Sequence, residues 1–132
     1  NSFYSFGIAT VKEIEKLNIL NASLLSMKRA ILNLSKKPNL VLIDGNFSPE
    51  LPFECKTIIK GDEKIKCISA ASILAKVHRD KIMIKMSKKF KHYYWSKNFG
   101  YGTKQHLLGL RKYGITTIHR KNFKPIHKML LK

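Results

Sequence analysis

Two aspartates directly follow short apolar runs that have the length and composition of buried strands. Asp44 closes the run "LVLID", and Asp62 follows the run "TIIKG". The chain has 26 Lys and Arg residues against only 8 Asp and Glu residues, so acids at these two positions need a physical reason. A carboxylate at the end of a buried strand must be paired, hydrogen-bonded or bound to a cation, because an isolated buried charge is very costly.

The positions of Asp44 and Asp62 predict a shared site for a divalent cation. The ends of neighbouring strands meet at one edge of an open α/β sheet, which is where such sheets place their sites. Carboxylates brought together there repel each other unless a cation lies between them, and Mg²⁺ or Mn²⁺ prefers oxygen ligands. Taken singly, each aspartate also fits an ordinary turn at a strand end. Taken as a pair in a chain this short of acids, they favour the metal site.

A second candidate site is the glycine-rich segment "GYGTKQH", residues 100–106. Its two glycines flank Tyr101 and leave that ring sterically free to stack on a sugar or a base, while Thr103 and His106 can hydrogen-bond phosphate. The alternative is a plain turn in which Tyr101 packs into the core and His106 is a structural histidine. The residue types alone leave both interpretations open.

A third candidate is the segment "SAASILAK", residues 69–76, at the start of a long predicted helix. Ser69 can cap that helix, and the backbone N–H groups at its N-terminus can bind an anion. Further along, Asp80 follows Arg79 and lies four positions after Lys76, which predicts an ion pair on the helix surface.

The elements that position these residues are predicted from apolar periodicity and from turn and cap signals. Their order indicates an α/β or α+β class, with a sheet covered by helices, in one domain without repeats or a composition break. In the first part of the chain we expect an edge or hairpin strand at 2–10, a short helical turn in 11–20, and a helix at 22–34 capped by Asn21 or Ser23. Strands at 40–43 and 56–60 follow, then a long helix from Ser69, a helix from Thr103 to Gly114, and a short helix near Pro125.

The net charge of +18 indicates an anionic partner, with nucleic acid first and an acidic membrane surface second. The alternative is compositional drift, because only four basic residues are arginine and the abundance of lysine, isoleucine and asparagine is typical of an AT-rich genome.

The sequence also indicates the cellular compartment of the protein. No apolar run approaches the roughly 20 residues that span a bilayer, and the first 20 residues do not have the pattern of a secretory signal, so we expect a cytoplasmic protein without membrane contact. Cys55 and Cys67 form neither a CxxC pair nor a Cys/His cluster and are expected to be reduced structural thiols. Because the first residue is Asn1 rather than methionine, we expect the gene to begin further upstream.

Five motifs in order closely resemble the bacterial ribonuclease HII family: "LVLIDGN", "IIKGD", "ISAASILAKVHRD", "FGYGTKQH" and "HRKNF". The segment "IATVKEIEKLNILNASLLSMKRAI" is similar to the part of that family upstream of the DGN turn. The resemblance implies an RNase H-like fold, a mixed β-sheet flanked by helices. It also implies endonucleolytic hydrolysis of the RNA strand of RNA–DNA hybrids and of ribonucleotides embedded in DNA, with 5′-phosphate and 3′-hydroxyl products.

The family uses four acidic residues around divalent metal, Mn²⁺ or Mg²⁺. By motif, Asp44 and Asp62 correspond to two of these catalytic metal ligands, and Tyr101 to the residue that lies against the ribose at the RNA–DNA junction. The resemblance further implies a set of substrate-side residues: Asn46, Lys60, Ser69, Lys76 and His106.

One part of the family pattern is absent from this sequence. The Asp-Glu followed by Gly-Arg-Gly on the family's first strand is not here, nor is anything upstream of residues 2–10. We therefore interpret residues 1–132 as the C-terminal two-thirds of a single ribonuclease HII catalytic domain that lacks the family's first strands. We expect a monomer whose cleavage, with two acids in place of four, is absent or very weak.

The rival hypothesis is a non-catalytic basic module that binds structured RNA or DNA through its lysines. Binding with a steep salt dependence and no effect of Mg²⁺ or Mn²⁺ would favour that module.

Overall fold

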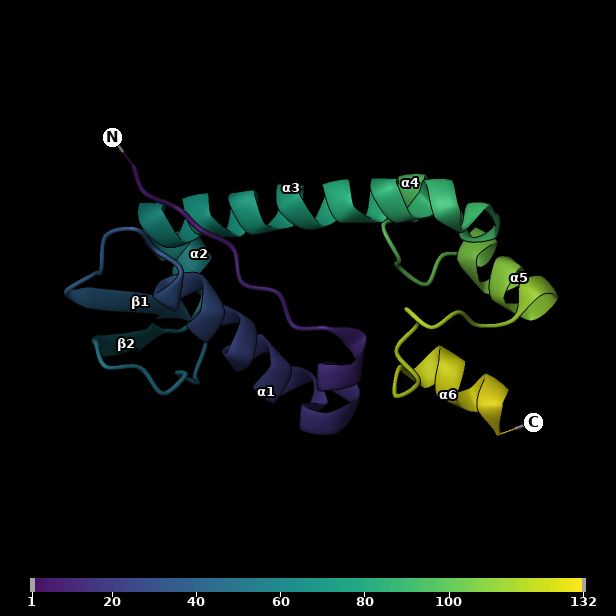
Figure 1. Cartoon of the computed structure of the whole chain (residues 1–132), viewed down its shortest axis with the longest axis horizontal. Helices are drawn as coiled ribbons and strands as arrows, with labels where there is room; N and C mark the ends of the chain where they lie inside the picture. Colours follow the sequence, from purple (N-terminus) through teal and green to yellow (C-terminus); the bar gives the residue numbers. More distant parts are fainter. Residues whose placement is uncertain (1, 132) are drawn as a thin grey trace. The chain divides into compact units, whose positions relative to one another are not determined.

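The computed structural model describes residues 2–131 and divides the chain into two compact units, Asn1–Ile73 and Leu74–Lys132. The units are described separately below. Figure 1 traces the elements in chain order: α1 (Val11–Leu32), β1 (Leu40–Asp44), β2 (Glu54–Ile58), α2 (Gly61–Lys64), α3 (Lys66–Lys89), the 3₁₀ helix η1 (Lys91–Tyr93), α4 (Trp95–Asn98), α5 (Lys104–Tyr113) and α6 (Lys124–Leu130).

The sheet of the first unit consists of β1 and β2, paired in parallel with Asp44 opposite Ile58. Past the end of β1 the Gly45 N–H donates to the Ile58 carbonyl at 3.0 Å, so both strands end at the same edge. The buried core of this unit contains Ala22 of α1, two residues of β1 and Ile68 of α3. These elements confirm the predicted α/β class. Within the described residues the sheet is purely parallel, whereas a mixed sheet was predicted.

The predicted edge strand at residues 2–10 is wrong. This segment has no strand partner in the described part of the chain and instead runs along α1. Gly7 allows the close approach, because a Cβ there would lie 1.9 Å from the Ser26 carbonyl oxygen and 2.5 Å from the Ala30 nitrogen. Arg29 adds a hydrogen bond to the Ile8 carbonyl at 2.7 Å. Alternating aromatic residues suit a strand only where a neighbouring strand satisfies the backbone groups.

The two predicted N-terminal helices form one element, α1, that is broken at Asn18. Thr10 and Glu13 form a capping box at its start. Asn18 has a φ of 70°, in the left-handed region, and its Oδ1 accepts the Asn21 N–H at 3.0 Å. Asn18 therefore caps the second segment, in the role that the sequence had assigned to Asn21 or Ser23.

The long helix begins earlier than predicted. α3 starts at Lys66, directly after the short α2, and the Ser69 N–H donates to the Ile65 carbonyl at 3.0 Å. Ser69 is therefore inside the helix and not its N-cap, because its N–H already has an intrahelical partner.

The core of the second unit is aromatic. Tyr93, Trp95, Leu110 and Ile126 are each at most 4% exposed, and the Tyr93 and Trp95 rings stack with their centroids 5.1 Å apart.

α5 lies where the sequence predicted it. Thr103 caps it by accepting the His106 N–H at 3.3 Å, and Gly114 ends it with a φ of 75°. The predicted last helix is also confirmed as α6.

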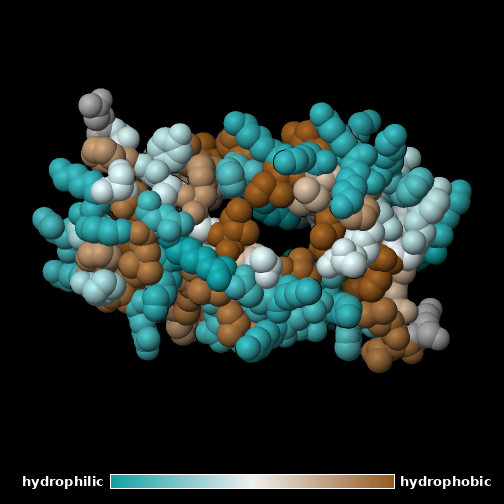
Figure 2. All heavy atoms as spheres, in the orientation of Figure 1, coloured by the Kyte–Doolittle hydropathy of each residue, from teal (hydrophilic) through white to brown (hydrophobic). Residues whose placement is uncertain are grey.

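The surface agrees with the basic composition. On the face shown in Figure 2, hydrophilic side chains cover much of both units and are interrupted by smaller hydrophobic areas. Among residues 2–131, no helix is both long enough and apolar enough to cross a bilayer.

Candidate active site

The structure brings the backbone before Asp62 into direct contact with Asp44. The Asp44 Oδ1 atom accepts the N–H of Gly61 at 2.8 Å, and Asp62 is the next residue along the chain. Gly61 is buried, and a Cβ on it would lie 2.8 Å from Ile68 Cδ1 and 3.5 Å from Asp44 Oδ1. The turn from β2 into α2 is thus packed closely against the end of β1. Both aspartates lie at the carboxyl edge of the parallel sheet, as their spacing predicted.

Both carboxylates are accessible from solvent. Asp44 and Asp62 are exposed, and the hydrogen bond from Gly61 occupies one oxygen of Asp44. Asp62 lies in the first turn of the short helix α2. Two carboxyl side chains at one sheet edge supply the oxygen ligands that a hard divalent cation prefers.

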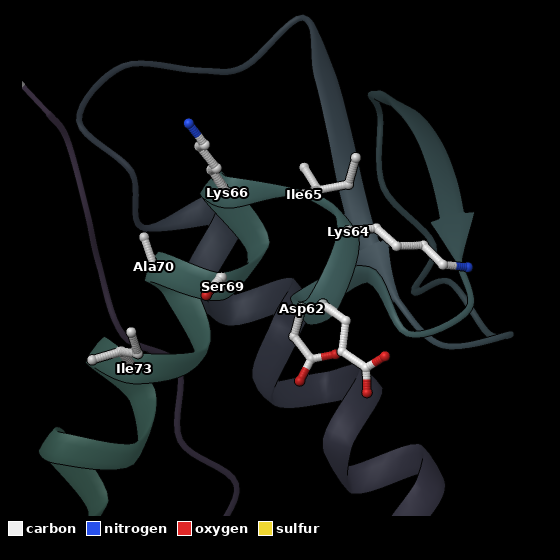
Figure 3. Close-up of a pocket in the computed structure, with 8 residues that line it drawn as sticks. Asp62, Lys64, Ile65, Lys66, Ser69, Ala70 and Ile73 are labelled. Carbon is white, nitrogen blue, oxygen red and sulfur yellow. The ribbon is translucent and has the colours of Figure 1, made fainter.

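A pocket of about 420 Å³ opens beside Asp62 (Figure 3). Asp62 of α2 and Ser69 of α3 line this pocket, whereas Asp44 and Asn46 do not. The Lys64 and Lys66 side chains point away from Asp62 on different sides, so the carboxylate has open space beside it. The lining residues are Asp62, Glu63, Lys64, Ile65, Lys66, Ser69, Ala70 and Ile73.

Asn46 and Lys60 flank this edge. Asn46 is exposed and follows Gly45, whose φ of 108° makes the sharp turn after β1. Lys60 has a φ of 55°, and its Nζ lies 3.8 Å from Glu63 Oε2. The first unit therefore gathers five of the eight predicted site residues around one edge: Asp44, Asn46, Lys60, Asp62 and Ser69.

The described residues supply few side chains that could bind a metal ion at this edge of the sheet. Across the described residues, no group of three or more His, Cys, Asp or Glu side chains gathers where a metal ion could bind. The donor chemistry of Asp44 and Asp62 fits a divalent cation, and this pair supplies part of a coordination shell.

The second unit presents Tyr101 outward. Its side chain is 67% exposed, which excludes the alternative in which the ring packs into the core. The Arg79 guanidinium lies 5.7 Å from the ring centroid. The backbone is held firmly, because the Tyr101 N–H donates to Asn98 O at 2.8 Å and its carbonyl accepts the Thr103 N–H at 2.8 Å. An exposed aromatic ring on a fixed backbone is suited to stacking on a nucleotide.

Lys76 forms the predicted ion pair with Asp80, with 2.6 Å between Nζ and Oδ2. The hydrogen bond that Lys76 donates to the Asp80 carboxylate raises the pKa of Lys76, so this amine stays charged. Its Nζ also lies 5.8 Å from the centroid of the Phe99 ring. Arg79 donates to the Phe99 carbonyl at 2.7 Å, so both cations border the segment that leads to Tyr101.

His106 is buried, with 4% exposure, and contacts the backbone of the Tyr101 segment rather than solvent. Its Nδ1 lies 2.9 Å from the Tyr101 carbonyl oxygen, and its Nε2 accepts the indole N–H of Trp95 at 3.1 Å. Its Nε2 also lies 3.3 Å from Nε2 of His119. The sequence placed Trp95 in the aromatic run "HYYW", which suits nucleic-acid contact or plain packing, and it assigned no role to His119. The only available signal was that His119 opens the family-like motif "HRKNF".

The burial of His119 leads to a testable prediction about how the stability of the fold depends on pH. Burial, together with the nearby His106, lowers the pKa of His119 from 6.5 to about 4. The unfolded chain therefore takes up a proton below about pH 6.5, whereas the folded chain does not until about pH 4, so stability falls as the pH falls through this window. We expect a loss of roughly 2 kcal/mol between pH 6.5 and 4.5 in urea unfolding followed by Trp95 fluorescence.

A His119→Gln variant is the matched control, since it should show a much flatter profile in the same pH window. The Glu13 carboxyl does not interfere, because the Arg29 hydrogen bond lowers its pKa from 4.5 to about 2 and its contribution is lost only below that window. An unchanged slope in His119→Gln would contradict the assignment.

A comparison with solved structures supports the fold. The crystal structure of the ribonuclease H2 from Pyrococcus horikoshii OT3 superposes with a TM-score of 0.71, covering 91% of this chain and 64% of that chain at 22% sequence identity. The chain thus has the RNase H-like fold that its motifs predicted.

Sequence similarity identifies the family to which the chain belongs. The family model for ribonuclease HII matches residues 2–126, and the chain belongs to the ribonuclease HII family. Ribonuclease HII of Pelagibacter ubique is 58% identical over 131 residues, covering 98% of this chain and 70% of that protein. The enzymes of Natranaerobius thermophilus and Coxiella burnetii are 51% and 47% identical, covering 96% and 97% of this chain and 64% and 63% of those proteins.

The family assignment confirms the predicted class, a ribonuclease and therefore a hydrolase, and favours it over the non-catalytic module. The chain spans 63% to 70% of the length of these relatives.

Proposed function

We propose that this chain carries the metal-binding edge and the ribonucleotide-contacting loop of an endonuclease that hydrolyses the RNA strand of RNA–DNA hybrids and ribonucleotides embedded in DNA. The observation that carries the proposal is the placement of Asp44 and Asp62 at the carboxyl edge of two parallel strands, joined through the Gly61 N–H.

In the proposed site, Asp44 and Asp62 hold a divalent cation, Mn²⁺ or Mg²⁺. When bound, such a cation supplies Lewis-acid stabilisation of the charge that develops on a phosphate undergoing hydrolysis. Gly61 keeps one Asp44 oxygen oriented through its hydrogen bond, and the accessible surface beside Asp62 leaves room for a phosphodiester. The proposed products carry 5′-phosphate and 3′-hydroxyl ends.

Each unit carries its own proposed substrate-side residues. Tyr101 is proposed to stack against the ribose at the RNA–DNA junction, with Lys76 near its segment contributing positive charge for the phosphate backbone. Asn46, Lys60 and Ser69 are proposed to contact the substrate from the metal edge, and His106 to act through the Tyr101 carbonyl that it contacts.

Because the relatives are bacterial and the proposed substrate is genomic nucleic acid, we propose that the protein acts in the cytoplasm. A monomer is the proposed state, which sedimentation would check.

The metal proposal predicts that Mn²⁺ binding depends on both aspartates. In Asp44→Asn and in Asp62→Asn, we expect the affinity for Mn²⁺, measured from the free-ion signal in electron paramagnetic resonance, to fall at least tenfold or so. Glu54→Gln is the matched control, because Glu54 begins β2 and therefore lies at the opposite edge of the same sheet. Equal affinities in all four proteins would exclude this edge as the metal site.

The substrate proposal predicts that Tyr101 supplies preference for a ribonucleotide. Loss of a stacking ring is worth about 1–3 kcal/mol, so Tyr101→Ala should weaken binding of a DNA duplex with one ribonucleotide by about 5- to 150-fold. Tyr101→Phe keeps the ring and should bind within a few-fold of the unsubstituted chain. Fluorescence anisotropy with an all-DNA duplex as reference measures the effect. An equal loss on both duplexes would mean that the ring contributes no preference.

A further inference from the structure

An exposed ring and a buried histidine pair share one hydrogen-bonded segment in the second unit. Tyr101 is 67% exposed, whereas His106 and His119 are 4% and 6% exposed. The chain of contacts runs from the Tyr101 carbonyl to His106, from His106 to His119, and from His119 to Thr116.

The donors and acceptors along this chain fix the tautomer of each ring. The Tyr101 carbonyl can only accept, so His106 carries its proton on Nδ1 and uses Nε2 as the acceptor for the Trp95 N–H. His119 Nδ1 accepts the Thr116 backbone N–H at 2.9 Å, so its proton is on Nε2 and points to His106 Nε2. With these tautomers, the Trp95 N–H and the Nε2–H of His119 both point to Nε2 of His106 and share its single lone pair.

The far end of the chain is anchored in a tight turn. Thr116 Oγ1 lies 2.8 Å from His119 Nδ1, and the His119 N–H donates back to the Thr116 carbonyl at 3.1 Å. The rings of Tyr93 and Trp95 pack on His119 with centroid distances of 4.9 and 5.2 Å. His119 is therefore held on several sides, and it limits the movement of His106.

We propose that His119 and His106 are positioning residues that fix the Tyr101 loop in the orientation that contacts a ribonucleotide. The proposal rests on the proposed function of Tyr101. Burial keeps both imidazoles away from the reacting phosphate, so they act on the reaction only through the Tyr101 backbone. The hydrogen bond from Nδ1 of His106 is the link that joins the core to the loop.

Two isosteric variants separate this link from simple packing. His106→Asn retains an amide N–H close to the place of Nδ1, whereas His106→Gln moves the amide to the place of Nε2 and loses the donor to Tyr101. We expect amide hydrogen exchange at Tyr101 and Thr103 to accelerate at least tenfold in His106→Gln and to stay near the unsubstituted rate in His106→Asn.

The Ile126 amide in α6, which bonds to the Phe123 carbonyl at 2.8 Å, reports whether the unit remains folded. Equal protection of Tyr101 and Thr103 in the two variants, with Ile126 unchanged, would overturn the proposal. If His106→Gln loses protection throughout the unit and His119→Gln does not, the exchange test is made on His119→Gln. The same local acceleration at Tyr101 and Thr103 is expected there. Its absence would overturn the proposal.

A double-mutant cycle tests whether the effect passes through Tyr101. The quantity measured is the ratio of affinities for a duplex with one ribonucleotide and for an all-DNA duplex. We expect His106→Gln to lower this ratio in the unsubstituted chain and to leave it unchanged in a Tyr101→Ala background. A full additional loss in that background would overturn the proposal.

The two proposals fail in different ways. If Tyr101→Ala itself leaves the ratio unchanged, the proposed substrate contact is wrong, and the exchange rates alone decide whether His106 orders the loop. If Tyr101→Ala lowers the ratio but His106→Gln and His119→Gln do not, the substrate contact stands and the positioning role is wrong.

Discussion

Replacing Asp44 by asparagine is expected to reduce cleavage of a ribonucleotide-containing duplex by at least about 100-fold, since loss of groups that merely orient a metal ligand already costs 10- to 100-fold. The substitution removes the charge while keeping an oxygen that can accept the Gly61 N–H, which Asp44 holds at 2.8 Å. The fold should therefore survive, and the effect should fall on metal binding.

The assay uses the chain joined to the part of the Pelagibacter ubique relative that lies outside the matched region, because the motif resemblance implies two further acidic ligands that these residues lack. Glu54→Gln in the same protein controls for loss of an exposed acid at the opposite sheet edge. Asp44→Asn cleaving as fast as that control would show that Asp44 is no metal ligand.

The second large effect is expected at Gly109, where α5 packs against η1. A Cβ at this position would lie 2.3 Å from the His92 carbonyl oxygen and 3.5 Å from the Tyr93 Cα. The contacts are with backbone, so a side-chain rotation cannot relieve them, and the stacked rings of His92 and Tyr113 must separate. We expect Gly109→Ala to destabilise the second unit by roughly 3 kcal/mol.

Trp95, the only tryptophan of the chain, reports this unfolding through its fluorescence in a urea titration. Gly102→Ala is the matched control for stability, because a Cβ at Gly102 meets nothing within 4 Å and its φ lies outside the left-handed region. Identical unfolding midpoints for Gly109→Ala and Gly102→Ala would contradict the close packing of α5 against η1.

The sequence predicted those features whose cause is local. Thr103 and Gly114 mark the ends of α5 because a hydroxyl cap and a left-handed glycine are requirements of the helix ends themselves. Asp44 and Asp62 converge because an apolar run before each one forms a strand, and the ends of parallel strands meet at one edge.

The features that the sequence missed depend on contacts between distant segments. Residues 2–10 have the composition of a strand but lie along α1, because Gly7 fits against the helix backbone. Ser69 has the residue type of an N-cap, yet α3 begins at Lys66 and the Ser69 N–H bonds to the Ile65 carbonyl. The role of His119 depends on its contact with His106, 13 positions away, and no local pattern predicts that contact.

The central claim is that the two carboxylates at the sheet edge belong to a metal-dependent ribonuclease. The most direct test is to incubate a DNA duplex containing one ribonucleotide with the 132-residue chain and with the extended chain, in Mn²⁺, in Mg²⁺ and in a chelator, and to map the product ends. We predict that the extended chain cuts at the ribonucleotide only with a divalent cation, leaving 5′-phosphate and 3′-hydroxyl ends, and that the 132-residue chain cuts very weakly or not at all. Cleavage that persists in the chelator, equal cleavage of an all-DNA duplex, or no cleavage by a folded extended chain would contradict the account.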